Sequence, residues 1–312
     1  MQLTPIMRYD FALRNTGLTI YISYEPIKTP QDLQDIRFNQ RGNFIICNHI
    51  DMKGFSFEPI PEFSGVLSGS TCEGGCKISN LLIQGQEEEV GLFAKNRGRI
   101  TQVNLVNVEV GGGGSRWNRT GAFAGLNYGV IHQSSVTGLV RGTGAFPSTA
   151  GMLAGGNYGV IEQSYAQGVV QGPARLAGLT GWNYIDRDNG MAGIVSQSYA
   201  HVHVQGGDTC VSGLVGLVGA GSHAPGIVTE SYSTGRVSTG ARSGGLIACL
   251  AGAGRVEKSF WDVETSAQNT SDGGIGRRTA IMKEPENYIR AGWDANVWIF
   301  ERGEYPKLAW QK

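Results

Sequence analysis

A segment of about thirty residues recurs along this chain, and the recurrence limits what the chain can fold into. Residues 121–134 (GAFAGLNYGVIHQS) return as residues 151–164 (GMLAGGNYGVIEQS), a step of 30 residues. An earlier copy spans residues 90–103. Three later copies end near Ser198, Ser231 and Ser259. A period of this length, with insertions tolerated between copies, is typical of a solenoid in which each repeat forms one coil.

The pattern within each repeat predicts β-strands rather than helices. Residues 106–110 (VNVEV) and 200–204 (AHVHV) alternate with a period of two, and no repeat carries a helical stripe of ten residues. Glycine makes up 48 of the 312 residues and punctuates these short strands, as expected at the corners of a coil. We therefore predict an all-β fold, a parallel β-helix whose coils stack about 4.8 Å apart, the distance between hydrogen-bonded strands.

Stacked coils would bring equivalent residues into columns. We place one valine column in the core with its neighbours outside, and we expect corner asparagines to hydrogen-bond along the stack, because side-chain amides both donate and accept. A serine column with an adjacent aromatic column completes the pattern. The columns are Val140, Val170, Val204 and Val237 inside; Leu139, Val169, His203 and Arg236 outside; Asn96, Asn127, Asn157 and Asn183; Ser134, Ser164, Ser198, Ser231 and Ser259; and Ser135, Tyr165, Tyr199, Tyr232 and Phe260.

Both ends of a solenoid need caps, because exposed strand edges invite aggregation. Thr29 as an N-cap and Pro30 at the first helical position predict a short helix that runs to Phe38 and covers the first coil. We divide the chain into an N-terminal cap with the first coil (1–60), the repeat coils (61–260) and a C-terminal cap (261–312). The aromatic residues expected to pack in that last cap are Trp293, Trp298, Phe300, Tyr305 and Trp310.

The residues that the copies share, G-x-[FL]-A-G-x-N-x-G-x-I-x-x-S-[YF], resemble the GLUG repeat of bacterial surface proteins and IgA-specific metallopeptidases. Residues 42–52 and 259–262 look like the modules that flank this repeat, and the resemblance covers about residues 22–310. It implies a right-handed parallel β-helix on a cell surface, and little about activity, because the repeat is a scaffold. The segment 72–76 and the coil at 210–231, which lacks the asparagine, depart from the pattern.

Net charge and hydropathy exclude some classes of binding partner and bear on the location of the protein. Lys plus Arg and Asp plus Glu each number 26, and a chain with no net charge is a poor partner for nucleic acid. The chain contains no run of 18 apolar residues, so we predict no membrane-spanning helix. Residues 1–15 lack the apolar core of a signal peptide. Because the repeat resembles that of surface proteins, we predict an extracellular or cell-surface location. The rival hypothesis is a protein that stays inside the cell or is injected into another cell. The sequence does not predict an oligomeric state.

The five cysteines are too few and too scattered to predict a disulfide framework. Cys72 and Cys76 flank a three-residue turn, so a local bridge between them is possible. We favour free thiols, and a CxxxC spacing without companion ligands is a poor zinc signal.

We find no constellation that predicts catalysis or a cofactor. The five histidines form no H-E-x-x-H motif, and neither G-x-S-x-G nor a P-loop is present. The peptidase activity found among proteins with this repeat is therefore not carried over. His201 and His203 share one strand face but have no evident third ligand, so we favour an exposed pair over a metal site. The acidic segment 186–190 is expected to be a polar insertion rather than a calcium loop.

Carboxylates could still make this solenoid a polysaccharide-cutting enzyme, since such enzymes place acids together on one outer face. We assign Glu162, Glu230 and Glu257 to one column beside the serines, with Glu230 and Glu257 one coil apart. A solvated ladder of charges is the favoured interpretation. A carbohydrate-active enzyme, or a phage tail component that binds a receptor, remains the alternative.

The predicted function is a non-enzymatic binding or adhesion module that contacts a glycan or protein on a host or neighbouring cell. Loops on a rigid scaffold are usual recognition sites, and the excursions here are residues 111–119, 144–149, 184–192 and 220–225. Tyrosines that follow the asparagine column would form a flat platform for sugar rings if they point outward; packing at a corner is slightly favoured. The candidate binding residues are Trp117, Tyr128, Tyr158, Tyr184, His201 and His203.

Overall fold

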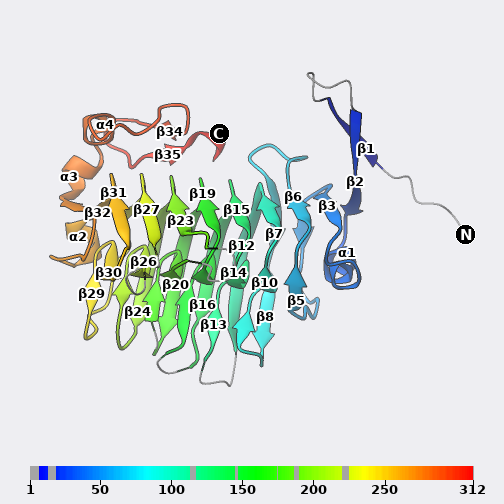
Figure 1. Ribbon diagram of the computed structural model, residues 1–312, viewed down its shortest axis with the longest axis horizontal. Helices are drawn as coiled ribbons and strands as arrows, with labels where there is room; N and C mark the ends of the chain where they lie inside the picture. The colour runs from blue at the N-terminus through cyan, green and yellow to red at the C-terminus, as the bar shows by residue number, and fades with distance from the viewer. Residues whose placement is uncertain are drawn as a thin grey trace, which may run out of the picture.

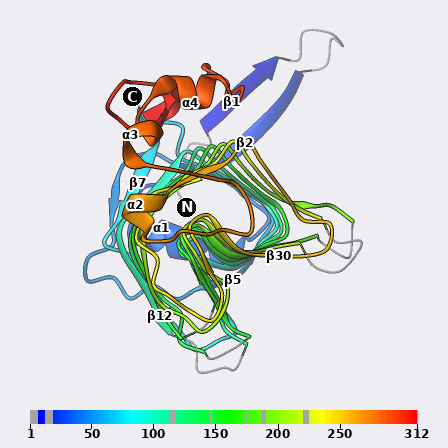
Figure 2. The same ribbon diagram turned by 90° about the vertical axis from the view of Figure 1, so that its left-hand side faces the viewer.

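The chain forms a parallel β-solenoid, seen from the side in Figure 1 and along its axis in Figure 2. The computed structural model describes residues 7–12, 19–112, 117–144, 147–173, 175–185, 190–219 and 225–311, and side chains from residue 23 onward. Within these residues four sheets run along the axis, and each strand pairs with the equivalent strand of the next coil. This confirms the predicted all-β solenoid of roughly thirty-residue coils.

Two of the four sheets, called sheets I and II here, form two of the sides of each coil. Sheet I contains β1 (Met7–Ala12), β2 (Thr19–Ile27), β3 (Asn43–Ile46), β6 (Val66–Ser68), β11 (Arg99–Thr101), β15 (Val130–His132), β19 (Val160–Glu162), β23 (Gly193–Ser196), β27 (Gly226–Thr229) and β31 (Arg255–Glu257). Sheet II contains β5 (Ile60–Phe63), β10 (Phe93–Asn96), β14 (Ala124–Asn127), β18 (Ala154–Asn157), β22 (Thr180–Asn183), β26 (Val215–Val218) and β30 (Ile247–Leu250). Only the β1–β2 pair in these sheets is antiparallel among the described strands.

The other two sheets complete each turn. Sheet III contains β4 (Ile50–Asp51), β7 (Cys76–Ser79), β8 (Leu82–Gly85), β12 (Val103–Gly112), β16 (Ser135–Arg141), β20 (Tyr165–Gly172), β24 (Tyr199–Gly206), β28 (Tyr232–Ser233), β32 (Phe260–Asp262) and β33 (Ile275–Arg277). Sheet IV contains β9 (Glu89–Val90), β13 (Arg119–Thr120), β17 (Thr149–Gly151), β21 (Arg175–Ala177), β25 (Val211–Ser212) and β29 (Ser243–Gly244).

The predicted columns form. Val140, Val170 and Val204 are fully buried and Val237 is 2% exposed, so the valines make a dry column inside the coil. Their neighbours lie outside, with His203 and Arg236 exposed and Leu139 and Val169 partly exposed. Burying each valine contributes about 1.5–3 kcal/mol relative to leaving it in water.

Polar ladders run beside the apolar core. Each asparagine amide donates to the next asparagine oxygen along the stack, at 2.7 Å for Asn96 to Asn127, for Asn127 to Asn157 and for Asn157 to Asn183. Each serine of the predicted column accepts a backbone N–H from the preceding coil; Ser134 N–H, for example, donates to Ser164 Oγ over 3.2 Å. Buried polar atoms are thus satisfied within the stack, which is the condition for burying them at all.

The glycine two residues after each asparagine is required by close approach between coils. A Cβ atom on Gly129 would lie 2.0 Å from the carbonyl oxygen of Gly98, and one on Gly159 would lie 2.1 Å from that of Gly129. Since real Cβ atoms do not approach backbone that closely, only glycine lets these corners stack.

The N-terminal cap matches its prediction. Helix α1 (Pro30–Asp35) continues as the 3₁₀ turn η1 (Ile36–Phe38). Thr29 accepts from the backbone N–H of Asp32, and the Asp32 carboxylate accepts in return from the Thr29 N–H. Leu33 and Ile36 are fully buried over the first coil, as expected.

The C-terminal aromatic cluster packs along the side of the solenoid. After α2 (Val263–Ser266), whose Val263 packs against the main core, the chain forms α3 (Thr279–Met282), α4 (Pro285–Ile289), β34 (Trp298–Ile299), β35 (Lys307–Leu308) and η2 (Ala309–Gln311), which carry this cluster. We call residues 278–311 the C-terminal strap; Figure 1 shows it folded back above the coils. Its aromatic rings cover the aromatic column of sheet III, where Tyr199 and Tyr232 stack at 5.0 Å. The strap does not cover the C-terminal end of the main core. That end is covered by Trp261, which is 6% exposed.

The expectation of free thiols is wrong for four of the five cysteines. Cys72 bonds to Cys76, and Cys210 bonds to Cys249, which leaves Cys47 free. The spacing of Cys210 and Cys249, 39 residues apart, carries no signal of proximity. Coil stacking brings them together from sheets IV and II.

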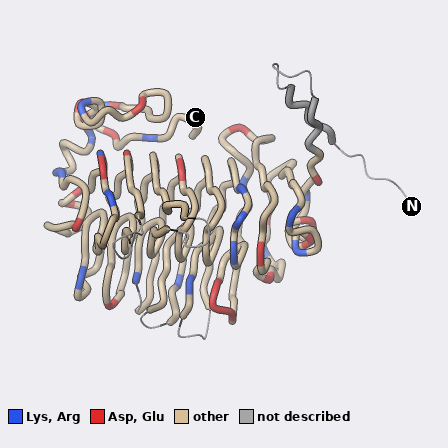
Figure 3. Tube along the Cα trace, in the orientation of Figure 1, with Lys and Arg blue, Asp and Glu red and all other residues tan. Residues whose placement is uncertain are grey.

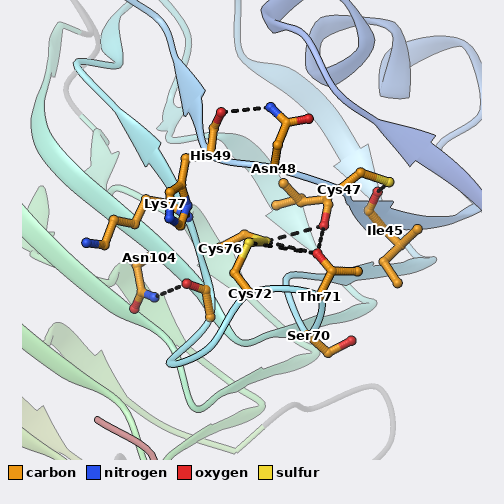
Figure 4. Close-up of a disulfide and its surroundings, with 12 residues drawn as sticks. Ile45, Cys47, Asn48, His49, Ser70, Thr71, Cys72, Cys76, Lys77 and Asn104 are labelled. Carbon is orange, nitrogen blue, oxygen red and sulfur yellow. Dashed lines mark hydrogen bonds between the residues drawn. A yellow bond between two sulfur atoms is a disulfide. The ribbon is translucent and has the colours of Figure 1, made fainter. Parts of the chain in front are cut away.

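The Cys72–Cys76 bridge closes an insertion at one corner of the coil. In the next coil a single residue, Gln102, joins Thr101 to Val103, and their register partners here are Ser68 and Cys76. In Figure 4, Cys47 points away from the bridge, with its thiol 3.6 Å from the Ile45 carbonyl oxygen.

Candidate functional site

Sheets II and IV meet at a sharp inward corner, so their outer faces turn toward each other (Figure 2). Glycines in sheet II allow this contact: a Cβ atom on Gly155 would lie 2.6 Å from the backbone nitrogen of Thr120. We call the two facing columns the seam. The sheet II column is Lys95, Leu126, Gly156, Trp182, Leu217 and Cys249. The sheet IV column is Glu89, Arg119, Thr149 and Arg175, and Cys210 and Arg242 continue it directly before β25 and β29.

The middle of the seam is filled by its own side chains. The Cys210–Cys249 disulfide crosses it at one end. Further along, the Arg119 guanidinium lies 5.4 Å from the Trp182 ring centre and 2.9 Å from the Glu89 carboxylate. Trp182 is only 7% exposed. The described side chains of this stretch therefore join the two sheets.

The seam opens into a cavity of about 860 Å³ at its N-terminal end. Helix and loop residues of the N-terminal cap form one wall, and the turn before β9 together with β10 forms the other. The lining residues are Arg37, Phe38, Gln40, Glu58, Pro59, Pro61, Gln84, Gly85, Gln86, Glu87, Glu89, Ala94 and Lys95. The Phe38 ring stands at this cavity with 82% of its surface exposed.

Charges around the cavity are paired with each other. Arg37 Nη1 lies 2.8 Å from Glu58 Oε2, and Lys95 Nζ lies 3.9 Å from Glu89 Oε2. Figure 3 shows that charged residues are sparse along the coils as a whole. The cavity thus combines one exposed aromatic ring, two prolines, glutamine amides and ion pairs.

The strand register places Trp117 one coil from a residue that lines this cavity. It is 51% exposed and lies one coil from Glu87, because the Asn118 amide donates to the Glu87 carbonyl and Arg119 pairs with Glu89 in the strand register. None of the six candidate binding residues is among those that line the cavity, and Trp117 is related to it only through this register.

Tyr128, Tyr158 and Tyr184 do not form a platform of ring faces. The rings of Tyr128 and Tyr158 stack on each other at 4.9 Å and 7°, and Arg97 covers Tyr128 at 4.4 Å. Tyr184 meets Tyr158 edge-on at 6.1 Å and stacks on Trp182, and burial raises its pKa. Because their faces are occupied by one another, the geometry fits the packing alternative, and a binding role for these tyrosines stays a prediction.

The two histidines differ from the expected exposed pair. His203 is exposed, but His201 lies partly buried beneath the strap, with its ring 5.6 Å from that of Tyr305. His201 Nδ1 contacts the Thr234 hydroxyl, and Nε2 lies 3.4 Å from the Tyr232 hydroxyl. Burial lowers the pKa of His201 to about 4. The prediction missed this because the strap comes from a distant part of the chain.

The structure was next compared with the metal site and the paired carboxylates considered from the sequence. In the part of the chain that the structure describes, no group of three or more His, Cys, Asp or Glu residues is arranged so that it could hold a metal ion. The assignment of Glu230 and Glu257 to one column is wrong: Glu230 aligns with Gln197 and Lys258, whereas Glu257 pairs with Thr229. Residues 186–189 of the acidic segment lie outside the described residues, as do parts of the side loops.

Sequence reasoning missed the cavity, although one signal for it was present. Leu33 and Ile36 are the residues of the short helix that face the core. Phe38 comes two residues after Ile36, a spacing that places it on another side of the helix from these two. An apolar ring at an outward position of the short helix was the available indication. The opposite wall could not be found, because Gln84 and Lys95 reach the cavity only through coil stacking.

The chain matches no family model. Over 107 residues it is 37% identical to a protein of Evansella cellulosilytica named as a Gly-rich membrane protein, which covers 32% of this chain and 12% of that protein. Over 88 residues it is 44% identical to halomucin of Haloquadratum walsbyi, covering 27% of this chain and 1% of that protein. The chain therefore spans only a small part of the length of the curated relatives that it matches.

A solved structure shares the fold over nearly the whole chain. The crystal structure of a protein assigned as an immunoglobulin A1 protease from Bacteroides ovatus superposes with a TM-score of 0.62 at 16% identity, covering 93% of each chain. At this identity the likeness shows the fold alone. It supports a β-helical architecture similar to that of proteins related to IgA proteases; membership of the GLUG repeat family stays a prediction. Among the described residues, no helix has the length and apolar character needed to cross a membrane.

Proposed function

We propose that this chain is a non-enzymatic binding module that acts outside the cell and contacts a glycan or protein through one flank of a rigid solenoid. The observation that carries the proposal is the cavity beside the N-terminal cap, with Phe38 82% exposed. Exposed aromatic rings beside a preformed concavity are typical of recognition sites.

The disulfides support an extracellular location. Two bridges join four of the five cysteines, and disulfides persist in oxidising compartments but are rare in the reducing cytosol. This chemistry disfavours the rival in which the protein stays inside the cell. The resemblance to surface proteins, and a relative named as a membrane protein, agree with this location.

The rigidity of the coils supports binding rather than turnover. Asparagine and serine ladders fasten each coil to the next, so the cavity is built before any ligand arrives. A preorganised surface loses little conformational freedom on binding. Glu230 and Glu257, the pair considered for glycoside cleavage, lie in different columns, and Glu162 shares the column of Glu257 only at a distance of three coils, so the stacked pair that the enzymatic alternative invoked does not form.

An array experiment tests the proposed function. The purified chain is applied to arrays of glycans and of extracellular matrix proteins, and the same glycans are assayed for new reducing ends. We expect selective binding without release of reducing ends. Absence of binding to every ligand tested would contradict the proposal, and release of reducing ends would establish the enzymatic alternative in its place.

A further inference from the structure

We propose that the cavity at the N-terminal end binds a neutral oligosaccharide, with one sugar ring packed on Phe38 and its hydroxyls bound by the glutamine amides. This inference rests on the proposed function and specifies the chemistry of the ligand. The exposed ring, the amides, the paired charges and the rigid lining each support it.

Phe38 supplies an apolar face that the described part of the chain leaves uncovered. Its ring is 82% exposed, whereas Leu33 and Ile36 of the same short helical segment are fully buried. A sugar ring has one face of C–H groups, and packing such a face on an aromatic ring removes apolar surface of both from water. Pro59 and Pro61 extend the apolar surface beside the ring.

Amide side chains supply the polar contacts. Gln84 and Gln86 line the cavity and are exposed, and within the described residues neither side chain is engaged in a hydrogen bond. Each primary amide offers two N–H donors and an accepting oxygen. A sugar hydroxyl both donates and accepts, so amides can pair with neighbouring hydroxyls without any charge on the ligand.

The charges of the cavity disfavour an acidic ligand. Arg37 is held by Glu58 at 2.8 Å, Lys95 lies 3.9 Å from Glu89, and Glu87 adds a further negative charge. Two cations and three carboxylates leave no surplus of positive charge. Binding of sulfated or uronic-acid chains draws on unpaired Lys and Arg, as does binding of nucleic acid, so the lining selects for an uncharged chain.

The walls of the cavity are held in place before binding. The buried Gln34 side chain accepts from the backbone N–H of Glu58 at 2.8 Å and donates to the Glu58 carbonyl at 3.1 Å. This pair of bonds fastens the Glu58–Pro59 loop to α1. Strand β10, which carries Lys95, is paired on both sides by β5 and β14. Preorganised walls lower the entropy lost on binding.

Calorimetric titration of the full chain with defined sugars tests this inference. The probes are tetramers of glucose, mannose, galactose and N-acetylglucosamine, with an oligogalacturonate and a heparin fragment as acidic probes. We expect at least one neutral tetramer to bind with little dependence on salt. Phe38→Ala is expected to weaken that binding about tenfold or more, and Gln84→Ala to weaken it measurably.

Ile281→Ala is the matched control, since Ile281 is an exposed apolar residue of α3, outside the cavity lining. It is expected to bind like the unmodified chain. Circular dichroism and melting curves are expected to show that all three variants fold. Tight binding of acidic probes alone, or unchanged binding by folded Phe38→Ala, would overturn the inference while the proposed function stood. No binding to any sugar or protein would overturn both.

Discussion

At the scale of single residues, the stack depends on polar side chains that are buried because each has partners one coil away. Asn157 is fully buried, and its amide accepts from Asn127 and donates to Asn183 and to two backbone carbonyls. The corner residues before the serines adopt positive φ without being glycine, as in Gln163 at 47°. Their amides join along the stack, with Gln133 donating to Gln163 at 3.0 Å.

Replacing one amide in the asparagine ladder is expected to weaken the whole stack. Asn157→Ala leaves the Asn183 oxygen and the carbonyls of Gly159 and Ile194 without this donor. We expect the free energy of unfolding to fall by about 2–3 kcal/mol, the usual cost of buried polar groups left unpaired. Denaturation in urea, followed by circular dichroism, measures it.

Gln167→Ala is the control for this substitution. Gln167 lies in the coil that begins just after Asn157, but its side chain is exposed on β20. We expect a change of less than about 0.5 kcal/mol there. Equal losses in the two variants would show that the asparagine ladder contributes nothing special to stability.

At the scale of elements, the strap and the seam join parts of the chain that are remote in sequence. The strap is anchored where Tyr232 donates to the Pro306 carbonyl at 2.7 Å and Trp310 donates to the Gln163 carbonyl at 2.8 Å. His201 lies beneath it, beside Thr234 and Tyr305. The seam is joined by the Cys210–Cys249 bridge. Each junction can be tested separately.

The strap is expected to loosen in mild acid. His201 has a pKa lowered to about 4 from 6.5 by burial, so the unfolded chain binds this proton more readily than the folded chain. Stability is therefore full above pH 6.5 and falls as the pH drops toward 4. The groups around the ring are Tyr199, Tyr232 and Tyr305; Tyr305 in turn donates to Asp262 and lies under Lys283.

Melting temperatures between pH 7 and pH 4 measure this effect, with Trp fluorescence of the strap as a second signal. His201→Gln is expected to flatten the decline over this window, because the side chain no longer titrates. His203→Gln, at an exposed position on the same strand, is the control and should keep the decline. The same pH profile in the His201 variant and the unmodified chain would contradict this prediction.

Loss of the seam disulfide is expected to destabilise the chain. Cys210 and Cys249 close a loop with a sequence separation of 39, and a cross-link of that span contributes about 3–4 kcal/mol by restricting the unfolded chain. The double variant Cys210→Ala, Cys249→Ala should melt at a lower temperature than the oxidised chain. Cys47→Ser, which removes the free thiol, should leave the melting temperature unchanged. Identical melting of all three proteins would contradict the role assigned to this bridge.

At the scale of the whole molecule, the chain is nearly one-dimensional, since each coil contacts chiefly its two neighbours. Stability in such a solenoid is close to a sum over coils and the interfaces between them. The strap is the exception: Gln311 contacts Tyr199, 112 residues away in sequence. The cavity is lined by the N-terminal cap and by β8 to β10, whereas the strap is anchored at Gln163, Tyr199 and Tyr232, so one coil between these two groups of contacts is dispensable in principle.

Deleting residues 104–134 removes one coil and joins Val103 to Ser135 without disturbing the register. The deletion preserves register because Ser135 is the strand partner of Asn104. We expect a folded solenoid that is about 4.8 Å shorter and melts at a lower temperature, since one coil interface is lost. Small-angle X-ray scattering and circular dichroism measure both changes.

Deleting only residues 104–118 is the contrasting variant. It removes half a coil, so every later strand would be offset from its column and polar side chains would face the core. We expect this protein to lose its cooperative melting transition. Cooperative folding of the half-coil deletion, or failure of the full-coil deletion to fold, would contradict the picture of interchangeable coils.

The sequence by itself determined the period, the strand content and the columns, because all three follow from local pattern repeated at a constant step. The repeat alone was enough to place Val140 and Asn157, and local capping residues were enough to place the helix that begins after Thr29. The disulfide pairing of Cys210, the covering of His201, and the cavity around Phe38 were decided only by tertiary structure. They depend on insertions, on how sharply sheets II and IV turn inward, and on where the strap comes to lie. None of these repeats along the chain, so no periodic signal reports them.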